Sequence, residues 1–157
     1  MAQKKVFTTV AVGVPGAKAT LNPFVYHPNT LLAEGEATVG NFVWPGADPE
    51  LQARNTTSGT DKPIGLVERN IVYPNYDLLD DGTLVVPDGS TLTIGICGDY
   101  WVAASTAAVA GQKAFASTTD GSIATGAAGA TVAGHVETDW TVETAGAAGE
   151  AIMISRH

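Results

Sequence analysis

The sequence predicts a mainly β fold, an antiparallel barrel or sandwich with little helix and an extended N-terminal arm. Two observations support this class. Eighteen glycines and 8 prolines interrupt the 157 residues so often that few windows leave room for a helix of average length. The stretches between these breakers alternate apolar and polar residues with a period of two, as half-buried strands do. We expect an arm over residues 1–30 and a β-rich decoration domain over residues 31–157.

The arm is predicted from its prolines. Pro15, Pro23 and Pro28 all fall within residues 14–29, and each removes a backbone donor that regular structure would need. We therefore expect this stretch to run extended over a surface rather than inside a core. Residues 6–12 have the pattern of a strand, which belongs either to the arm or to an edge of the domain itself.

The remaining strands are predicted between turn signals. The sequence Pro-Asp-Gly-Ser at residues 87–90 is one such turn, since proline presets φ and glycine accepts positive φ. The expected strands cover residues 37–44, 64–69, 83–86, 91–97, 100–103, 113–116, 135–144 and 151–155.

The C-terminal part has the clearest alternation. Val136, Thr138, Trp140 and Val142 share one face of residues 135–144, and the small-residue run that follows predicts a hairpin with residues 151–155. The Ala-rich stretch 103–111 is expected to form one helical turn at most. Residues 124–134, which are almost entirely Ala, Gly and Thr, are expected to be a flexible insertion.

Composition excludes several classes of function. The sequence has 8 Lys and Arg and 16 Asp and Glu, which gives a formal net charge of −8. Neither nucleic acid nor an anionic membrane surface is therefore an expected partner. No run approaches the roughly 20 apolar residues that span a bilayer. Much of the hydrophobic content is alanine, which buries little area. We therefore expect a thin core and stabilisation by partner subunits.

Cysteine and histidine give no catalytic signature. The lone Cys97 cannot form an intramolecular disulfide and is expected to be a half-buried strand residue in a protein made in a reducing cytoplasm. The alternative is a thiol hydrolase that uses Cys97 with His27 or His135, but no family-specific sequence surrounds the cysteine. His27, His135 and His157 lack the spacing of a transition-metal site.

Two groups of carboxylates have simpler explanations than chemistry. Asp77, Asp80 and Asp81 precede a glycine without the ligand order of a calcium-binding hand, so an Asp-rich turn is favoured. Glu34 and Glu36 share a strand face, where charge at a solvated edge deters unwanted pairing. We therefore predict no catalytic residue, no metal site and no cofactor.

Several stretches, in order, resemble the structural cement (decoration) proteins of bacteriophage capsids. They are PIGLVERN at residues 63–70, VVPDG at 85–89 leading into GDYWV at 98–102, and GQKAFA at 111–116 followed by Asp-Gly at 120–121. Upstream, VGVPG at residues 12–16 and EATVGNFVW at 36–44 resemble the extended N-terminal part of that family. The resemblance covers about residues 6–123 and, more loosely, the last hairpin.

The resemblance implies a non-enzymatic, β-rich subunit, often trimeric, on the capsid exterior at local threefold positions. Its partners would be the major capsid protein and two further copies of itself. It would bridge major capsid subunits and stabilise the mature head. The alternative is a head-fibre base or adhesin-type binding module. The expected capsid or subunit contacts are arm residues and two tryptophans, namely Lys4, Lys5, Phe7, Phe24, Tyr26, Trp44 and Trp101.

Overall fold

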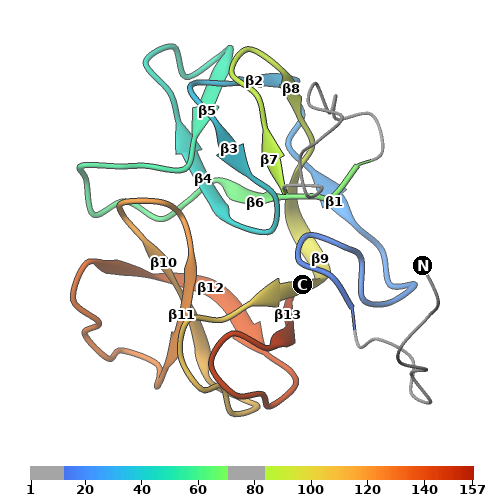
Figure 1. Ribbon diagram of the computed structural model, residues 1–157, viewed down its shortest axis with the longest axis vertical. Helices are drawn as coiled ribbons and strands as arrows, with labels where there is room; N and C mark the ends of the chain where they lie inside the picture. Colours follow the sequence, from blue (N-terminus) through green and yellow to red (C-terminus); the bar gives the residue numbers. More distant parts are fainter. Residues whose placement is uncertain (1–12, 71–83) are drawn as a thin grey trace, which may run out of the picture.

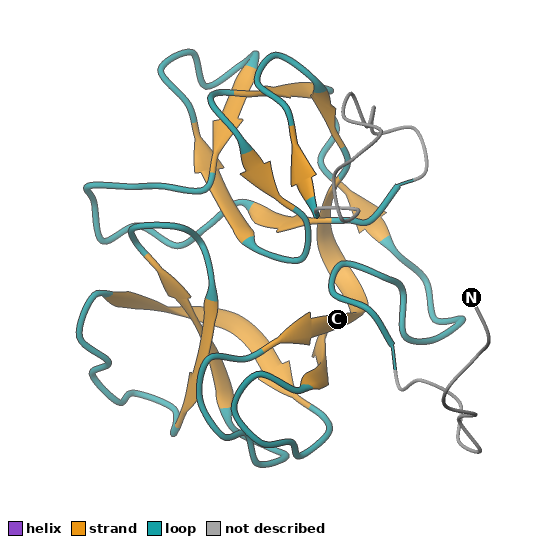
Figure 2. Cartoon of the chain, in the orientation of Figure 1, coloured by secondary structure: helices purple, strands orange, loops and turns teal. Residues whose placement is uncertain are grey.

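The computed structural model describes residues 13–70 and 84–157 (Figure 1). All regular elements in these residues are strands, and Figure 2 shows them without any helix, which confirms the predicted mainly β class. The strands are β1 (Val25–Tyr26), β2 (Leu31–Ala33), β3 (Ala37–Thr38), β4 (Phe42–Pro45), β5 (Gln52–Arg54), β6 (Gly65–Val67), β7 (Val85–Val86), β8 (Thr91–Leu92), β9 (Ile94–Ala103), β10 (Lys113–Ser117), β11 (Ile123–Gly126), β12 (His135–Val142) and β13 (Ala151–Arg156).

Eleven of these strands form one large sheet. Its order is β11-β10-β12-β13-β9-β6-β4-β5-β2-β8, with β1 paired to β9 beside this path, while β3 and β7 form a separate two-stranded sheet. The pairs are antiparallel except for β2 and β5, which run parallel. In Figure 1, β2–β8 make an upper lobe and β10–β13 a lower lobe, and the ten-residue strand β9 passes from one to the other.

β4 and β6 are buried on both faces because they separate two apolar cores. Phe42 and Trp44 face the larger core while Val43, between them, faces the smaller one. Leu66 and Val67 of β6 divide in the same way. Neighbouring strand residues point to opposite faces, so a strand covered on both sides has a continuous apolar run instead of alternation.

The two cores differ in size and place. The larger one contains Phe42, Trp44, Leu66, Tyr100, Val102, Ala104, Ala108, Ala114, Ala116, Ile123, Trp140, Val142, Ile152 and Ile154. The smaller one, in the upper lobe, contains Leu31, Ala33, Ala37, Val39, Val43, Ala53, Val67, Val86, Leu92 and Ile94. β9 therefore contributes to both cores, through Ile94 at its start and through Tyr100 and Val102 near its end.

Two glycines in β9 make room for aromatic rings rather than breaking the strand. A Cβ at Gly95 would lie 2.3 Å from the Tyr100 hydroxyl oxygen, and one at Gly98 would lie 2.3 Å from Cδ1 of Phe24. The sequence predicted separate strands over residues 91–97 and 100–103. The structure instead joins most of this stretch into β9, since both glycines are held within paired backbone.

A third glycine divides a stretch that was predicted to be one strand. Residues 37–44 contain β3 and the start of β4, and Gly40 between them has a φ of +84°. A Cβ there would lie 2.8 Å from Cβ of Pro15, so the chain turns where the N-terminal segment packs against it. The prediction of a single strand over 37–44 was wrong for this reason.

The Ala-rich stretch 103–111 contains no helical turn. Its backbone groups pair with other segments: Ala108 exchanges both hydrogen bonds with Gly146, and the Ala104 carbonyl accepts from the Gly149 amide.

The predicted insertion 124–134 also begins later than expected, because residues 124–126 are the end of β11 and Ala124 is 1% exposed. The loop that remains covers residues 127–134 and is largely exposed.

The C-terminal hairpin is confirmed. β12 and β13 pair antiparallel, with Thr141 opposite Ser155 and Val142 opposite Ile154. Thr138, Trp140 and Val142 are buried on one face, as the alternation predicted.

Close backbone packing between β6 and β9 gives a test of the architecture. A Cβ at Gly65 would lie 2.5 Å from the Gly95 carbonyl oxygen, and this backbone atom cannot move without opening the sheet. We expect Gly65→Ala to lower the free energy of unfolding by about 1–3 kcal/mol in urea denaturation. Gly59→Ala is the control, since no neighbouring atom comes within 3.5 Å of its added Cβ. Equal stability of the two variants would contradict the packing described here.

Candidate functional site

The N-terminal segment, residues 13–30, lies along β9 (Figure 1). The Gly16 amide donates to the Trp101 carbonyl (2.8 Å), and the Trp101 amide donates to the Ala17 carbonyl (2.9 Å). The Ala19 amide donates to the Asp99 carbonyl, and further along β1 pairs with the first half of β9. Backbone pairing therefore fixes the path of the segment over the strand that joins the two lobes.

The buried carboxylate of Asp99 contacts both the N-terminal segment and the C-terminal residue His157. Asp99 is 3% exposed and accepts from the Thr20 hydroxyl (2.5 Å), the Asn22 side-chain amide (2.7 Å) and Nε2 of His157 (2.9 Å). Burial by itself raises the pKa of Asp99, but these hydrogen bonds and the nearby His157 outweigh it and hold the pKa below its usual value. The charged form is therefore the one that the fold stabilises.

A second buried carboxylate, that of Glu68, also contacts the N-terminal segment. The Tyr100 hydroxyl donates to Oε2 of Glu68 (2.9 Å), and Lys18 Nζ lies 3.5 Å from Oε1 of the same group. Burial, followed by the charge of Glu68, raises the pKa of Tyr100, so the phenol remains a donor. The Lys18 ammonium also lies over the rings of Phe24 (5.1 Å) and Tyr26 (5.4 Å), a cation–π arrangement within the segment itself.

The segment exposes apolar side chains although it is firmly anchored. Seven large apolar residues are exposed in the described part of the chain, and four of them are Val14, Leu21, Val25 and Tyr26. Leu21 is as exposed as in an extended peptide, at 104%. Such side chains on a fixed backbone form a surface suited to contact with another protein.

The structure brings together two of the predicted contact residues. Phe24 packs against the larger core and meets Tyr100 edge-on, while Tyr26 reaches the same Lys18 ammonium from β1. Trp101 is half-buried on β9, with Gly13 so close that a Cβ there would lie 2.4 Å from its Cγ.

The other predicted contact residues lie elsewhere. Trp44 is a core residue, 2% exposed, whose indole N–H donates to the Asp61 carbonyl (2.8 Å). Lys4, Lys5 and Phe7 lie outside the described residues.

Sequence reasoning missed the residues that anchor the segment. Lys18, Glu68 and Asp99 had no assigned role, although Glu68 and Asp99 stood within the stretches that carry the family resemblance. The only available signal was an acidic residue inside an otherwise apolar strand pattern, which indicates a buried and partnered charge.

The hypothesis of thiol chemistry finds no support in the geometry. Cys97 is half-buried on β9 opposite Val25, while Nδ1 of His27 lies 3.1 Å from the Asn29 carbonyl and Nδ1 of His135 lies 2.9 Å from the Ala133 carbonyl. Within residues 13–70 and 84–157, no three His, Cys, Asp or Glu side chains gather as a metal site would require. The same residues contain no helix long and apolar enough to cross a membrane.

Glu34 and Glu36 do not share a strand face as predicted, because residues 34–36 form the connection between β2 and β3. Glu34 is structural, because its carboxylate accepts from the Ala47 amide (2.6 Å) and lies 3.4 Å from the Arg54 guanidinium. Asp77, Asp80 and Asp81 lie outside the described residues.

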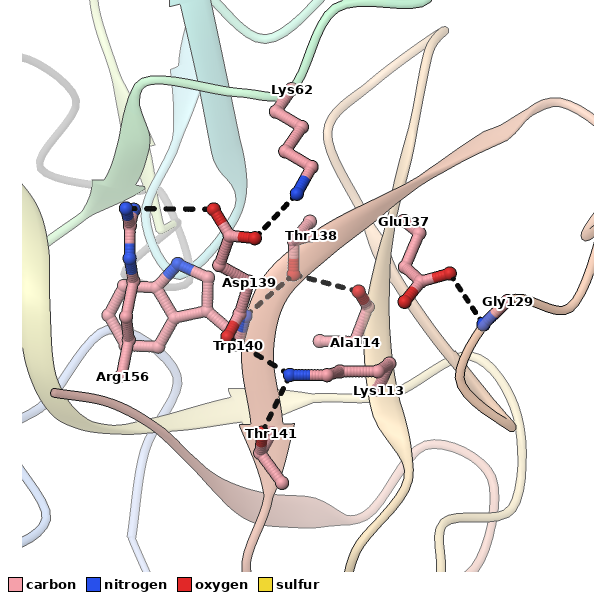
Figure 3. Close-up of polar contacts among 10 residues, drawn as sticks. All are labelled: Lys62, Lys113, Ala114, Gly129, Glu137, Thr138, Asp139, Trp140, Thr141 and Arg156. Atoms are coloured by element: carbon pink, nitrogen blue, oxygen red, sulfur yellow. Dashed lines mark hydrogen bonds and ion pairs between the residues drawn. The ribbon is translucent and has the colours of Figure 1, made fainter.

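A surface ion network joins the two lobes at Asp139 (Figure 3). Lys62, from the loop before β6, and Arg156 of β13 each approach one carboxylate oxygen of Asp139, at 2.5 and 3.6 Å. Lys113 donates to the Asp139 carbonyl (3.3 Å) and to the Thr141 hydroxyl (3.1 Å). Lys62 above all lowers the pKa of Asp139. Both side chains of the shorter pair are about half exposed, so this network contributes little stability.

The two aspartates allow a matched test of the anchor. Because Asp99 has a lowered pKa in the folded state, its stabilisation is complete above the unfolded pKa and is lost as the pH falls through the folded value. We expect Asp99→Asn to cost about 1–3 kcal/mol in urea unfolding at pH 7, and the difference from wild type to shrink below about pH 4. Asp139→Asn, at an exposed pair, should cost less than about 1 kcal/mol. A loss that does not change with pH would argue against the charged anchor.

Comparison with known proteins finds similarity to components of phage heads. The model of the XM1 gp53 minor capsid protein family matches residues 4–156. A chain from the capsid of Myoviridae phage XM1 has a TM-score of 0.70 at 17% sequence identity, covering 98% of this chain and 96% of that one. The head fibre gp8.5 N base of bacteriophage phi29 has a TM-score of 0.53 at 10% identity, covering 86% and 95%. No curated protein matches the sequence.

The family match extends over nearly the whole chain, from residue 4 to residue 156. It agrees with the prediction of a phage structural protein rather than an enzyme. The surface built by residues 13–30 is then a candidate contact surface and not a reaction centre. The chain belongs to the XM1 gp53 minor capsid protein family and is a structural component of a phage capsid.

Proposed function

We propose that this minor capsid protein is a structural cement: it binds the outside of the capsid and bridges neighbouring major capsid subunits, which stabilises the mature head. Membership of a minor capsid protein family and the fold shared with a chain of the XM1 capsid support a place in the shell. The resemblance of the stretches at residues 63–70, 85–102 and 111–121 to cement proteins supports the exterior position and the homotrimer.

The observation that carries this proposal is the exposed apolar face of the N-terminal segment. Val14, Leu21 and Val25 are exposed on a backbone that β9, Asp99 and Glu68 hold in place. A surface that is already ordered loses little conformational entropy when it binds, so more of its contact energy becomes affinity. Lys4, Lys5 and Phe7, which lie outside the described residues, are further expected contacts, and the two cations would pair with acidic groups of the shell.

Stabilisation of the head follows from binding linkage. A protein that binds the mature lattice but not an open or broken one shifts the equilibrium towards the mature form. At a concentration 100 times the dissociation constant, each site contributes about 2.7 kcal/mol. Many equivalent copies multiply this effect, so no single contact has to be strong.

A head-fibre base is the second candidate function. The fold similarity to the head fibre base of phage phi29 favours it. The two functions differ in copy number, because a cement occupies equivalent positions over the lattice whereas a fibre base occupies few.

Co-sedimentation with mature heads that lack the protein tests both functions. We expect wild-type protein to saturate near one copy per major capsid subunit, and Leu21→Asp to weaken binding at least tenfold, about 1.4 kcal/mol, because it places a charge in an apolar contact. Val109→Asp is the control, since Val109 is 60% exposed but lies on the turn before β10.

The outcomes separate the candidates. Saturation at a handful of copies per head would favour the fibre base. Absence of wild-type binding would contradict both functions, and an equal loss for Leu21→Asp and Val109→Asp would contradict the role of the N-terminal segment.

A further inference from the structure

The loop between β4 and β5, residues 46–51, forms a second exposed apolar surface together with β2. Leu51 is 57% exposed and Leu32 is 37% exposed. They are neighbours, because the Leu32 amide donates to the Leu51 carbonyl (2.8 Å). In Figure 1 this loop lies at the top of the upper lobe, whereas the N-terminal segment runs beside β9 up to β1 and then leads into β2. The β4–β5 loop therefore lies on a different part of the molecule from the portion of the N-terminal segment that precedes β1.

The loop has a fixed conformation. Glu34 accepts from the Ala47 amide, and Asp48 turns the chain back by accepting from the Glu50 amide through its side chain (3.1 Å) and from the Gln52 amide through its carbonyl (2.8 Å). The two ends of the loop are joined by a backbone hydrogen bond, which the Gly46 amide donates to the Gln52 carbonyl (2.8 Å). Leu51 is thus presented on an ordered turn, as an interface anchor would be.

The charges around the leucines indicate the chemistry of the partner. Arg54 neutralises Glu34, but Asp48 and Glu50 are exposed and form no ion pair with any residue that the structure describes. An apolar pair beside two uncompensated carboxylates fits a partner surface that is apolar in its centre and carries Lys or Arg at its rim.

We propose that this surface, defined by Leu32, Leu51, Asp48 and Glu50, docks on a basic-rimmed patch of a second major capsid subunit. The inference rests on the proposed cement function and deepens it: the N-terminal segment contacts one capsid subunit and the β4–β5 loop contacts its neighbour. A bridge needs two separate contact surfaces, and the described chain presents these two on different parts of the molecule.

The test titrates heads that lack the protein with full-length variants. Leu51→Ser should raise the half-saturating concentration at least fivefold, while Val109→Ser, which removes an equally exposed apolar side chain elsewhere, should stay within twofold of wild type. Glu50→Gln should weaken binding severalfold at low salt, and this difference should vanish at about 0.5 M salt because screening removes the charge contribution. The melting temperature of each free variant should match that of wild type, since the altered side chains are exposed.

The outcomes distinguish this surface from the proposed function. Wild-type binding with Leu51→Ser equal to Val109→Ser would overturn the docking surface and leave the cement function in place. No wild-type binding would overturn the cement function and the docking surface with it. Sedimentation velocity of the free protein, without heads, tests a third outcome. If Leu51→Ser lowers the mass of the oligomer, the surface contacts another copy of this chain and the proposal is wrong.

Discussion

Asp99 and Tyr100 are adjacent buried polar residues in the strand that crosses both lobes, and much of the structure is arranged to give them partners. A buried carboxylate costs several kcal/mol unless hydrogen bonds replace its water. Those hydrogen bonds come from Thr20 and Asn22 in the N-terminal segment and from His157 at the C-terminus, while Glu68, directly after β6, accepts the hydrogen bond of the Tyr100 hydroxyl. Satisfying these groups fixes the N-terminal segment, the C-terminus and the junction of the lobes together.

The sequence predicted the strands best where only one face is buried. Residues 135–144 alternate because Trp140 packs inward and Asp139 faces solvent, so their period is visible. The glycines at 95 and 98 look like strand breakers in the sequence, and only the positions of the Tyr100 and Phe24 rings explain them. The hydrogen bonds that hold the N-terminal segment to Asp99 could not be predicted from the sequence either. Thr20 and Asp99 are 79 positions apart, and no local pattern marks a pairing over that separation.

A contact surface of the proposed kind has no chemical motif in the sequence. It needs no nucleophile, metal ligand or phosphate loop, so motif analysis finds little, and its residues are ordinary apolar side chains that become informative only when the fold shows them to be exposed. The relationship to the XM1 capsid chain illustrates the same point, because the fold is shared at a TM-score of 0.70 with only 17% identity. Packing constrains residue type loosely as long as volume and patterning are kept.

The loop at residues 127–134 has a practical consequence. Its ends are fixed by β11 and β12, which both pair with β10, whereas the residues between them are largely exposed. Extending such a loop costs little, since each doubling of its length adds only about 0.6 kcal/mol of closure entropy. A foreign peptide inserted there would leave the N-terminal segment and the β4–β5 loop untouched. An inserted peptide is therefore better tolerated at this loop than at either proposed contact surface.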